Sequence, residues 1–226
     1  MKKIISFSLW GDDTRYTMGA LHNASLAKIV YPNWTCRFYT GKTVPEDILS
    51  HLSEFNNVEI IPTNEDGNWK STFWRFLAAS DENIDTVIVR DCDSRLWYRE
   101  KLAVEEWLKS DKDFHIIRDH PYHNVPILAG MWGVRNNFLK NMKTLCSQYN
   151  KEDLKQSDQN FLRDVIYPIV KDKSYTHDTF FQKSQLPGAR DQKHFVGQVY
   201  AGCGRILDAE EYFQDFLARE YNAQRT

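Results

Sequence analysis

Two aspartates one residue apart, Asp91 and Asp93, are the residues whose types and spacing most suggest chemistry. They follow Thr86–Val89, an apolar run rich in β-branched residues that predicts a strand buried on both faces. Carboxylates just past such a strand lie at the edge of an open α/β sheet where ligands usually bind. They suit Mg²⁺ or Mn²⁺, which proteins hold with one or two carboxylates plus substrate phosphates. The alternative interpretation is a solvated acidic turn. Because the motif is so short, the motif by itself favours this alternative.

A third protein ligand would strengthen the metal hypothesis. His177 is the first candidate and His194 the alternative, both in a late segment that is predicted to be rich in loops. Taken singly, each histidine is also typical of an ordinary surface or core position. A cation held by Asp91 and Asp93 would bridge to a diphosphate and neutralise its charge as it leaves.

Asp158 and Asp119 are the candidate general bases. Asp158 opens a predicted helix, where an acid contributes roughly 0.5–1 kcal/mol as a cap or first-turn residue. An acid at a helix start that faces a cleft can also accept a proton. Asp119 ends a predicted strand and has the same two interpretations. Arg75 lies between aromatic residues, where it could pair with Asp91 or a phosphate, or stack on Trp74.

Gly130 and Gly133 flank Met131 and Trp132. One interpretation is a tight turn with a tryptophan in the core. The other is a sugar site, because glycine lets the backbone approach a ligand closely and Trp132 offers a stacking face.

Strand and helix patterns alternate through the first half of the chain, which predicts a mostly parallel sheet with helices on both faces. Strands are predicted over 3–9, 35–40, 58–61, 86–89 and 114–118, and helices over 16–30, 45–55, 72–79 and 99–108. The second half is less regular, with helices predicted over 137–149, 158–170 and 209–221 and a loop-rich stretch over 174–200. Neither a Gly-x-Gly-x-x-Gly nor a Walker pattern follows the first strand, which excludes an ordinary dinucleotide or P-loop fold.

Composition narrows the partners. The chain has 226 residues, enough for one domain with a substantial core, and 29 basic against 31 acidic residues, which argues against nucleic-acid and polybasic membrane binding. No window approaches the roughly 18 apolar residues of a membrane span, and the first residues are too polar for a signal peptide. The four widely spaced cysteines are typical of reduced thiols, so we expect a cytoplasmic protein. The oligomeric state stays open.

Several motifs occur in a fixed order along residues 1 to about 200. They are Ser6-Phe7-Ser8-Leu9-Trp10-Gly11, Phe73-Trp74-Arg75-Phe76, Arg90-Asp91-Cys92-Asp93-Ser94-Arg95, Arg118-Asp119-His120-Pro121, Gly130-Met131-Trp132-Gly133, Asp158-Gln159-Asn160-Phe161-Leu162 and Phe195-Val196-Gly197. This set resembles the small GT-A glycosyltransferases, and most of all the glycosyltransferase domain found in chloroviruses. No single motif is decisive, but the ordered set is fairly specific.

The resemblance implies a single GT-A domain over 1–226. It would comprise a Rossmann-like nucleotide-sugar-binding half (about 1–118), a less regular sugar and acceptor half (about 119–205) and a C-terminal helix (206–226). It implies a hexosyl- or deoxyhexosyltransferase that depends on Mn²⁺ or Mg²⁺ and moves a sugar from a nucleotide-sugar donor, with a UDP-sugar as the expected donor, to a glycan or other hydroxyl acceptor. If the protein acts in viral glycan synthesis, the expected location is the cytoplasm of the host cell.

Roles carry over from the resemblance residue by residue. The nucleoside would be held by Ser8, Leu9, Trp10 and Tyr16, with Arg75 also at the nucleotide. Asp91 would contact ribose or metal, and Asp93 the metal. Gly130, Met131 and Trp132 would line the sugar site, while Asp119 and Asp158 would face donor sugar and acceptor. Asp158 is the preferred base and Asp119 the second choice if the enzyme inverts configuration. Cys92 departs from the pattern, at a position that is usually tolerant.

Two other functions compete. A haloacid-dehalogenase-like phosphatase would use Asp91 as a nucleophile, but its motif normally lies on an early strand with Thr or Val two residues later, where this chain has Arg95. A non-catalytic sugar-binding module would use Trp10, Trp74 and Trp132 as platforms. Donor sugar, acceptor and stereochemistry depend on loop geometry that one sequence does not fix.

Overall fold

The computed structural model of the chain describes residues 2–149, 153–182, 184–190 and 194–206. Within them, a seven-stranded sheet has the order β3-β2-β1-β4-β6-β5-β7. The strands are β1 (Lys3–Leu9), β2 (Thr35–Thr40), β3 (Val58–Pro62), β4 (Thr86–Val89), β5 (Phe114–Arg118), β6 (Trp132–Arg135) and β7 (Ser174–Asp178). All neighbours are parallel except that β6 runs antiparallel to β4 and β5. The predicted α/β class with a mostly parallel sheet is confirmed.

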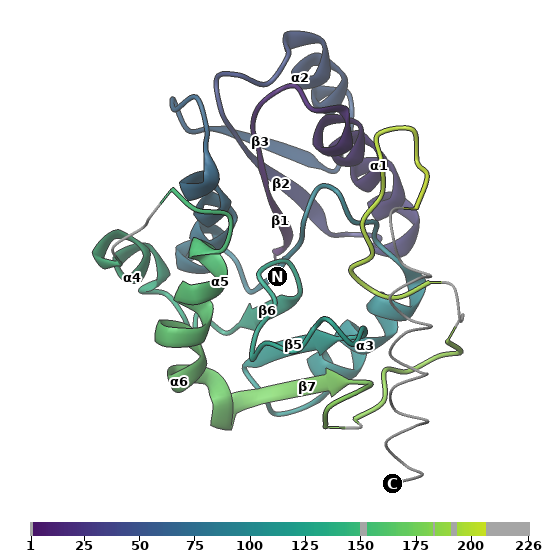
Figure 1. Cartoon of the computed structure of the whole chain (residues 1–226), viewed down its shortest axis with the longest axis vertical. Coiled ribbons are helices and arrows are strands. Elements are labelled where there is room, and N and C mark those ends of the chain that lie inside the picture. Colours follow the sequence, from purple (N-terminus) through teal and green to yellow (C-terminus); the bar gives the residue numbers. More distant parts are fainter. Residues whose placement is uncertain (1, 150–152, 183, 191–193, 207–226) are drawn as a thin grey trace, which may run out of the picture.

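Helices flank the sheet (Figure 1). They are α1 (Thr14–Val30), α2 (Glu46–Ser53), the 3₁₀ helix η1 (Trp69–Ser80), α3 (Tyr98–Lys109), α4 (Met142–Gln148), α5 (Ser157–Phe161), the π-helical turn η2 (Leu162–Ile166), α6 (Tyr167–Val170) and the 3₁₀ turn η3 (Lys171–Lys173). One large apolar cluster joins the sheet to α1, α2 and α3, and a second joins it to η1, α4, α5 and η2. A third, smaller cluster lies around Ala103, Ile117 and Met131. In β4, Ile88 belongs to the first cluster and Val87 and Val89 to the second, so this strand is buried on both faces as predicted.

Two strands were missed by the sequence prediction. β6 is only four residues long and has Gly133 in its middle, so it resembles a turn around a tryptophan. β7 lies at the edge of the sheet and is mostly polar, with Ser174, Thr176 and His177, so its sequence resembles a loop. Neither strand has the apolar run or the alternation that marks a strand in sequence.

Helix boundaries differ from the predicted ones for local reasons. The helix predicted over 137–149 begins only at Met142, because Asn136 and Asn137 adopt positive φ angles of 58° and 53°, which a helix does not allow. The helix predicted over 158–170 is interrupted by the π-helical turn η2, which ends two residues before Pro168, a residue with no N–H to donate.

The predicted helix over 209–221 lies outside the described residues. In the part of the chain that the structure does describe, no helix is both long and apolar enough to span a bilayer.

Candidate active site

A cleft of about 760 Å³ opens where β1 and β4 end. This volume is in the range of small-molecule sites. The described residues that line it come from both halves of the chain and include Ser8, Tyr16, Arg75, Asp91, Asp93 and Asp158. The structure therefore brings together most of the residues that the sequence singled out.

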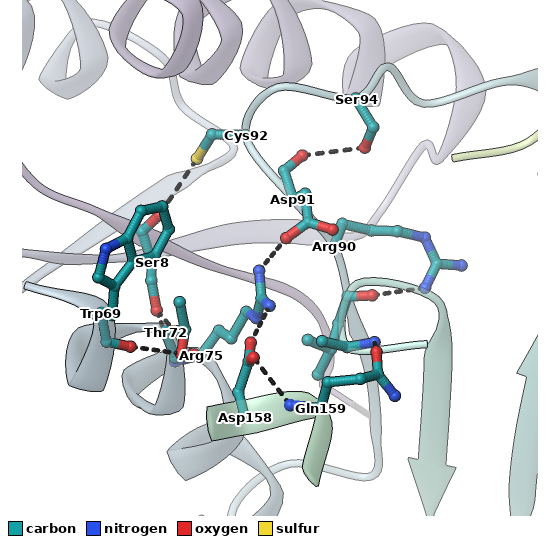
Figure 2. A network of polar contacts seen from close by, with 12 residues as sticks. Ser8, Trp69, Thr72, Arg75, Arg90, Asp91, Cys92, Ser94, Asp158 and Gln159 are labelled. Carbon is teal, nitrogen blue, oxygen red and sulfur yellow. Dashed lines mark hydrogen bonds and ion pairs between the residues drawn. The ribbon is translucent and has the colours of Figure 1, made fainter. Parts of the chain in front are cut away.

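Arg75 connects the acidic motif to Asp158 (Figure 2). One guanidinium nitrogen pairs with Asp91 and the other lies 2.8 Å from Asp158 Oδ2. Of the alternatives that the sequence left open for Arg75, the structure shows the pairing with Asp91. The backbone of Arg75 is held as well, because the Arg75 N–H donates to Ser8 Oγ at 3.0 Å and the Arg75 carbonyl accepts from Ser6 Oγ at 2.7 Å. A buried arginine between two carboxylates thus links η1, the end of β4 and the start of α5.

Asp93, one acid of the Asp91–Asp93 pair, has a clearly perturbed pKa. Burial, together with the charge of Asp91, raises the pKa of Asp93 to about 7. Burial and the same two carboxylates also raise the pKa of Tyr16. Two carboxylates that repel each other this strongly are a suitable site for a cation, which would relieve the repulsion.

The donor set at Asp91 and Asp93 fits a hard divalent ion. Among the described residues no group of three or more His, Cys, Asp or Glu side chains is placed to hold a metal ion. An ion at this pair would therefore complete its shell with phosphate and water oxygens, as Mg²⁺ commonly does.

The loop that carries the acidic pair is held by α1, through two residues that the sequence analysis missed. The Asn23 side chain donates to the carbonyl of Ser94 at 2.9 Å and accepts from the N–H of Leu96 at 3.1 Å. Gly19 lets α1 approach the loop, because a Cβ there would lie 2.0 Å from the Cys92 carbonyl oxygen. A glycine inside a helix costs about 1 kcal/mol, so its presence was the available sequence signal of a close approach.

Gly130 makes room for Asp91. A Cβ at this position would lie 1.9 Å from Asp91 Oδ2. The close approach that the sequence predicted at Gly130 is therefore to the acidic motif. Met131 also lines the cleft, and Gly133 instead lies over Trp107 and Ile88 in the core.

If the acidic pair holds a divalent cation, Gly130→Ala is expected to weaken Mn²⁺ binding by roughly 10- to 100-fold, because the new methyl group displaces the Asp91 carboxylate. Gly133→Ala is the matched control, since its methyl group crowds Trp107 and Ile88 and should cost about 1–3 kcal/mol of stability instead. Calorimetry and thermal unfolding of both variants separate the two effects. Equal ligand affinity in Gly130→Ala and the wild type would contradict this function of Gly130.

Two predicted ligand contacts are not supported, because their side chains face the core. Trp132 is fully buried, with Phe76 and Phe114 each at 5.4 Å between ring centroids, so it offers no face to a sugar. Leu9 is also fully buried, in the cluster under α1, and only its backbone remains near the end of β1. Ser8, the preceding residue, points to the opposite face and lines the cleft.

Asp119 was predicted as a second base and a sugar contact, and the structure gives it another role. It is fully buried, pairs with Arg99, and accepts hydrogen bonds from Thr179 Oγ1 at 2.7 Å and from the Val196 N–H at 3.0 Å. Both carboxylate oxygens are therefore engaged, and Asp119 is not among the cleft residues. It anchors the segment around Val196 to the end of β5.

The structure does not bring His177 to the acidic pair. β7 is three strands from β4, which is about 14 Å at roughly 4.8 Å per strand. The two ring nitrogens of His177 lie 2.9 Å from His115 Nε2 and 2.8 Å from Glu106 Oε2. His194 packs against Trp97 at 5.0 Å between ring centroids and is also absent from the described cleft lining.

Asp158 keeps the features of a base. It lines the cleft at the start of α5, and burial raises its pKa although Arg75 opposes that shift. A carboxylate with a raised pKa accepts a proton more readily.

Trp10 lines the β1 side of the cleft. It packs edge-on against Trp69 and Trp74, at 6.4 and 6.2 Å between ring centroids. Gly67 adopts a φ of 99°, and a Cβ there would lie 2.3 Å from Trp10 Cβ. The ring of Trp10 is thus fixed by its neighbours.

In comparison with solved structures, the chain shares the fold of GT-A glycosyltransferases. One neighbour is a glycosyltransferase involved in glycosylation of the major capsid of PBCV-1, with a TM-score of 0.53 and 14% identity over 80% of this chain and 84% of that chain. The predicted resemblance in fold is confirmed.

Two further neighbours are synthases of glycosylated phosphoglycerates. For mannosyl-3-phosphoglycerate synthase from Rubrobacter xylanophilus the TM-score is 0.52 and the identity 11%, over 79% of this chain and 65% of that chain. For glucosyl-3-phosphoglycerate synthase from Mycobacterium tuberculosis in complex with UDP, the TM-score is 0.51 and the identity 10%, over 84% of this chain and 72% of that chain. The chain thus spans less than two thirds of the mannosyl enzyme. No family model matches the chain, and neither does any curated protein.

Proposed function

We propose that this protein is a metal-dependent glycosyltransferase that moves a sugar from a nucleotide sugar, with a UDP-sugar as the first candidate, to a hydroxyl acceptor. The observation that carries the proposal is the Asp91–Arg75–Asp158 chain of ion pairs, which lies beside Asp93 in one cleft. The GT-A fold supports it, and a neighbour with this fold is a glucosyltransferase in complex with Mn²⁺, UDP-glucose and glycerol 3-phosphate.

Residues in different parts of the cleft would contact different parts of the donor. Ser8, Trp10 and Tyr16, in the first half of the chain, would contact the nucleoside. Asp93, with Asp91, would hold a divalent cation, which supplies positive charge beside the leaving diphosphate. Arg75 is the nearest cation to Asp91 and would contact the same diphosphate. The halves proposed as about 1–118 and 119–205 would thus meet at the reacting sugar.

Asp158 would act on the acceptor if the reaction inverts configuration. The acceptor oxygen forms the new glycosidic bond, its proton passes to the Asp158 carboxylate, and the bond from the sugar to the diphosphate breaks with both electrons leaving on the diphosphate. Positioning of donor and acceptor supplies the rest of the rate enhancement. In a retaining reaction Asp158 would only orient the acceptor.

Calorimetry with UDP, with and without Mn²⁺, followed by a screen of UDP- and GDP-sugars for Mn²⁺-dependent hydrolysis, tests the proposal. Binding of UDP that needs Mn²⁺, and hydrolysis of at least one donor, are the expected results. Tight binding of free sugars that needs neither nucleotide nor metal would favour a sugar-binding module instead. Turnover of a simple aryl phosphate would favour the phosphatase.

Manganese affinity is expected to rise with pH up to about 7 and then level off. Since the pKa of Asp93 is raised to about 7, the metal-free site holds a proton below that pH, and the proton competes with the cation. Each pH unit below 7 should weaken binding by up to about tenfold. Titration of Mn²⁺ alone, followed by electron paramagnetic resonance, measures this without interference from a titrating phosphate. A flat profile between about pH 5.5 and 8 would contradict it.

A further inference from the structure

The cleft has an aromatic end that the proposed nucleotide and metal contacts leave unused. This aromatic end consists of four residues that line the cleft: His120, Tyr122, His123 and Phe195. Three of them lie in the loop after β5, and Phe195 comes from the late segment that Asp119 anchors through Val196. In the sheet order, β5 lies three strands from β1. The aromatic end is therefore on the side of Asp91 away from Ser8 and Trp10.

The four rings form one contact network. Phe195 lies 4.2 Å from His120 and 5.5 Å from His123 between ring centroids, and Tyr122 lies 5.5 Å from His120. Tyr122 is 57% exposed and lines the cleft, so it presents an aromatic side chain at the mouth of the cleft. Gly197 follows with a φ of 89°, and a side chain there would be pressed against Met131 and His123.

His120 supplies a polar group with no partner. Its Nδ1 accepts the N–H of Tyr122 at 3.2 Å, so the neutral ring carries its proton on Nε2. That Nε2 is buried and has no hydrogen-bond partner among the described residues. A buried polar atom left unpaired in a cleft wall is costly unless a ligand or water completes it.

The aromatic end carries no charge, in contrast to the rest of the cleft. Among the described lining residues the cations are Arg15, Arg75 and Lys155. Arg15 lies on α1, Arg75 on η1, and Lys155 over the Trp69 ring, so all three belong to the nucleotide side. The cleft is therefore positive where a diphosphate is expected and neutral at its other end.

The histidines do not change this charge. Burial lowers the pKa of His120 to about 4 and that of His123 to about 3, so both rings are neutral at physiological pH. Three arginines lie near these rings, and none of them is among the described residues that line the cleft. Arg99 pairs with Asp119, and Arg118 lies 2.7 Å from Asp178. Arg190, whose charge also lowers the pKa of His120, donates to the Asp119 carbonyl at 3.4 Å and lies over the Phe180 ring.

We propose that the aromatic end is the acceptor subsite and that it takes an uncharged sugar ring, in preference to a phosphorylated or otherwise anionic acceptor. An aromatic face has negative electrostatic potential and packs well against the C–H groups of a pyranose, whereas no cation among the described lining residues of this end would compensate a buried anion. This inference rests on the proposed function and adds the class of acceptor to it.

Calorimetry on the full chain loaded with UDP and Mn²⁺ tests the inference. Methyl glycosides of glucose, galactose, mannose and their 6-deoxy forms are compared with the 6-phosphates of the three hexoses. At least one methyl glycoside should bind, and the phosphates should bind at least about tenfold more weakly. A hexose phosphate that binds as tightly, or a loaded protein that binds no sugar, would overturn the inference. Failure to bind UDP with Mn²⁺ would instead overturn the proposed function.

Three tyrosine variants locate the subsite. Tyr122→Ala should weaken glycoside binding by about tenfold, and Tyr122→Phe should keep it within about twofold because the ring remains. Tyr98→Ala is the matched control, since Tyr98 is similarly exposed, at 63%, but lies on α3 and is not among the cleft residues. Equal affinities in Tyr122→Ala and Tyr98→Ala would place the acceptor elsewhere and overturn the assignment.

Discussion

Asp93→Asn is expected to lower Mn²⁺-dependent transfer by at least about a thousandfold, or about 4 kcal/mol of transition-state stabilisation. The substitution keeps the size of the side chain and removes one of the two carboxylates that would hold the cation. Asparagine is a much weaker ligand, and the described residues include no third acid or histidine that could replace it. The measurement is the steady-state rate at saturating Mn²⁺, with the nucleotide sugar that the donor screen finds to be a substrate.

The same substitution should not unfold the protein. The raised pKa of Asp93 means that the folded chain binds this proton more tightly than the unfolded chain does. Ionised Asp93 therefore lowers stability progressively as pH rises from about 4 to about 7, and the loss stays constant above that. Without metal, Asp93→Asn should be as stable as the wild type or more stable near pH 8. Without this carboxylate, Mn²⁺ with UDP should no longer raise the melting temperature.

Asp111→Asn provides the control for Asp93→Asn, because Asp111 is an exposed acid outside the cleft. Full metal-dependent activity in Asp93→Asn would sink the assignment of the acidic motif. Loss of folding in Asp93→Asn would contradict the electrostatic explanation, since removal of a repelling charge should not destabilise the chain.

The sequence predicted those parts of the fold whose pattern is local. β1, β2, β4 and β5 have the predicted bounds, because each is a short segment rich in β-branched, aliphatic or aromatic residues. β6 and β7 were missed because their pairing is decided by tertiary context. His177 illustrates the point: its strand is recognisable only through its pairing with β5, and its ring contacts His115 across that pair. A histidine chosen for its residue type alone was therefore misplaced.

The position of a site residue was predictable where the local sequence alone determines it. Asp91 and Asp93 follow a strand, so their place at the sheet edge was fixed by that strand. Asp119 also follows a strand, yet its carboxylate is taken by Arg99, which lies 20 residues earlier on another element. Trp132 could have been excluded by strand alternation, but only if β6 had been recognised. Long-range partners therefore account for the errors.

Glu100→Ala is expected to cost about 3–5 kcal/mol of unfolding free energy, because it leaves the guanidinium of Arg90 buried without its carboxylate. Both side chains are 1% exposed, Arg90 Nε lies 2.7 Å from Glu100 Oε1, and the Tyr31 hydroxyl donates to the same oxygen at 3.0 Å. For a domain of this size the melting temperature should fall by roughly 6 to 20 °C, as calorimetry would show.

The double variant Arg90→Met/Glu100→Leu separates the cost of an unpaired charge from the value of the pair itself. Replacing both partners by apolar residues of similar volume is often neutral or stabilising, so the double variant should recover most of the lost stability. Arg90 directly precedes Asp91 and also donates to the Val89 carbonyl at 2.7 Å and the Trp132 carbonyl at 3.2 Å. If the pair serves to aim the acidic motif, the double variant will be stable but will bind Mn²⁺ and UDP more weakly. If both stability and binding return to wild-type values, the pair contributes only to packing.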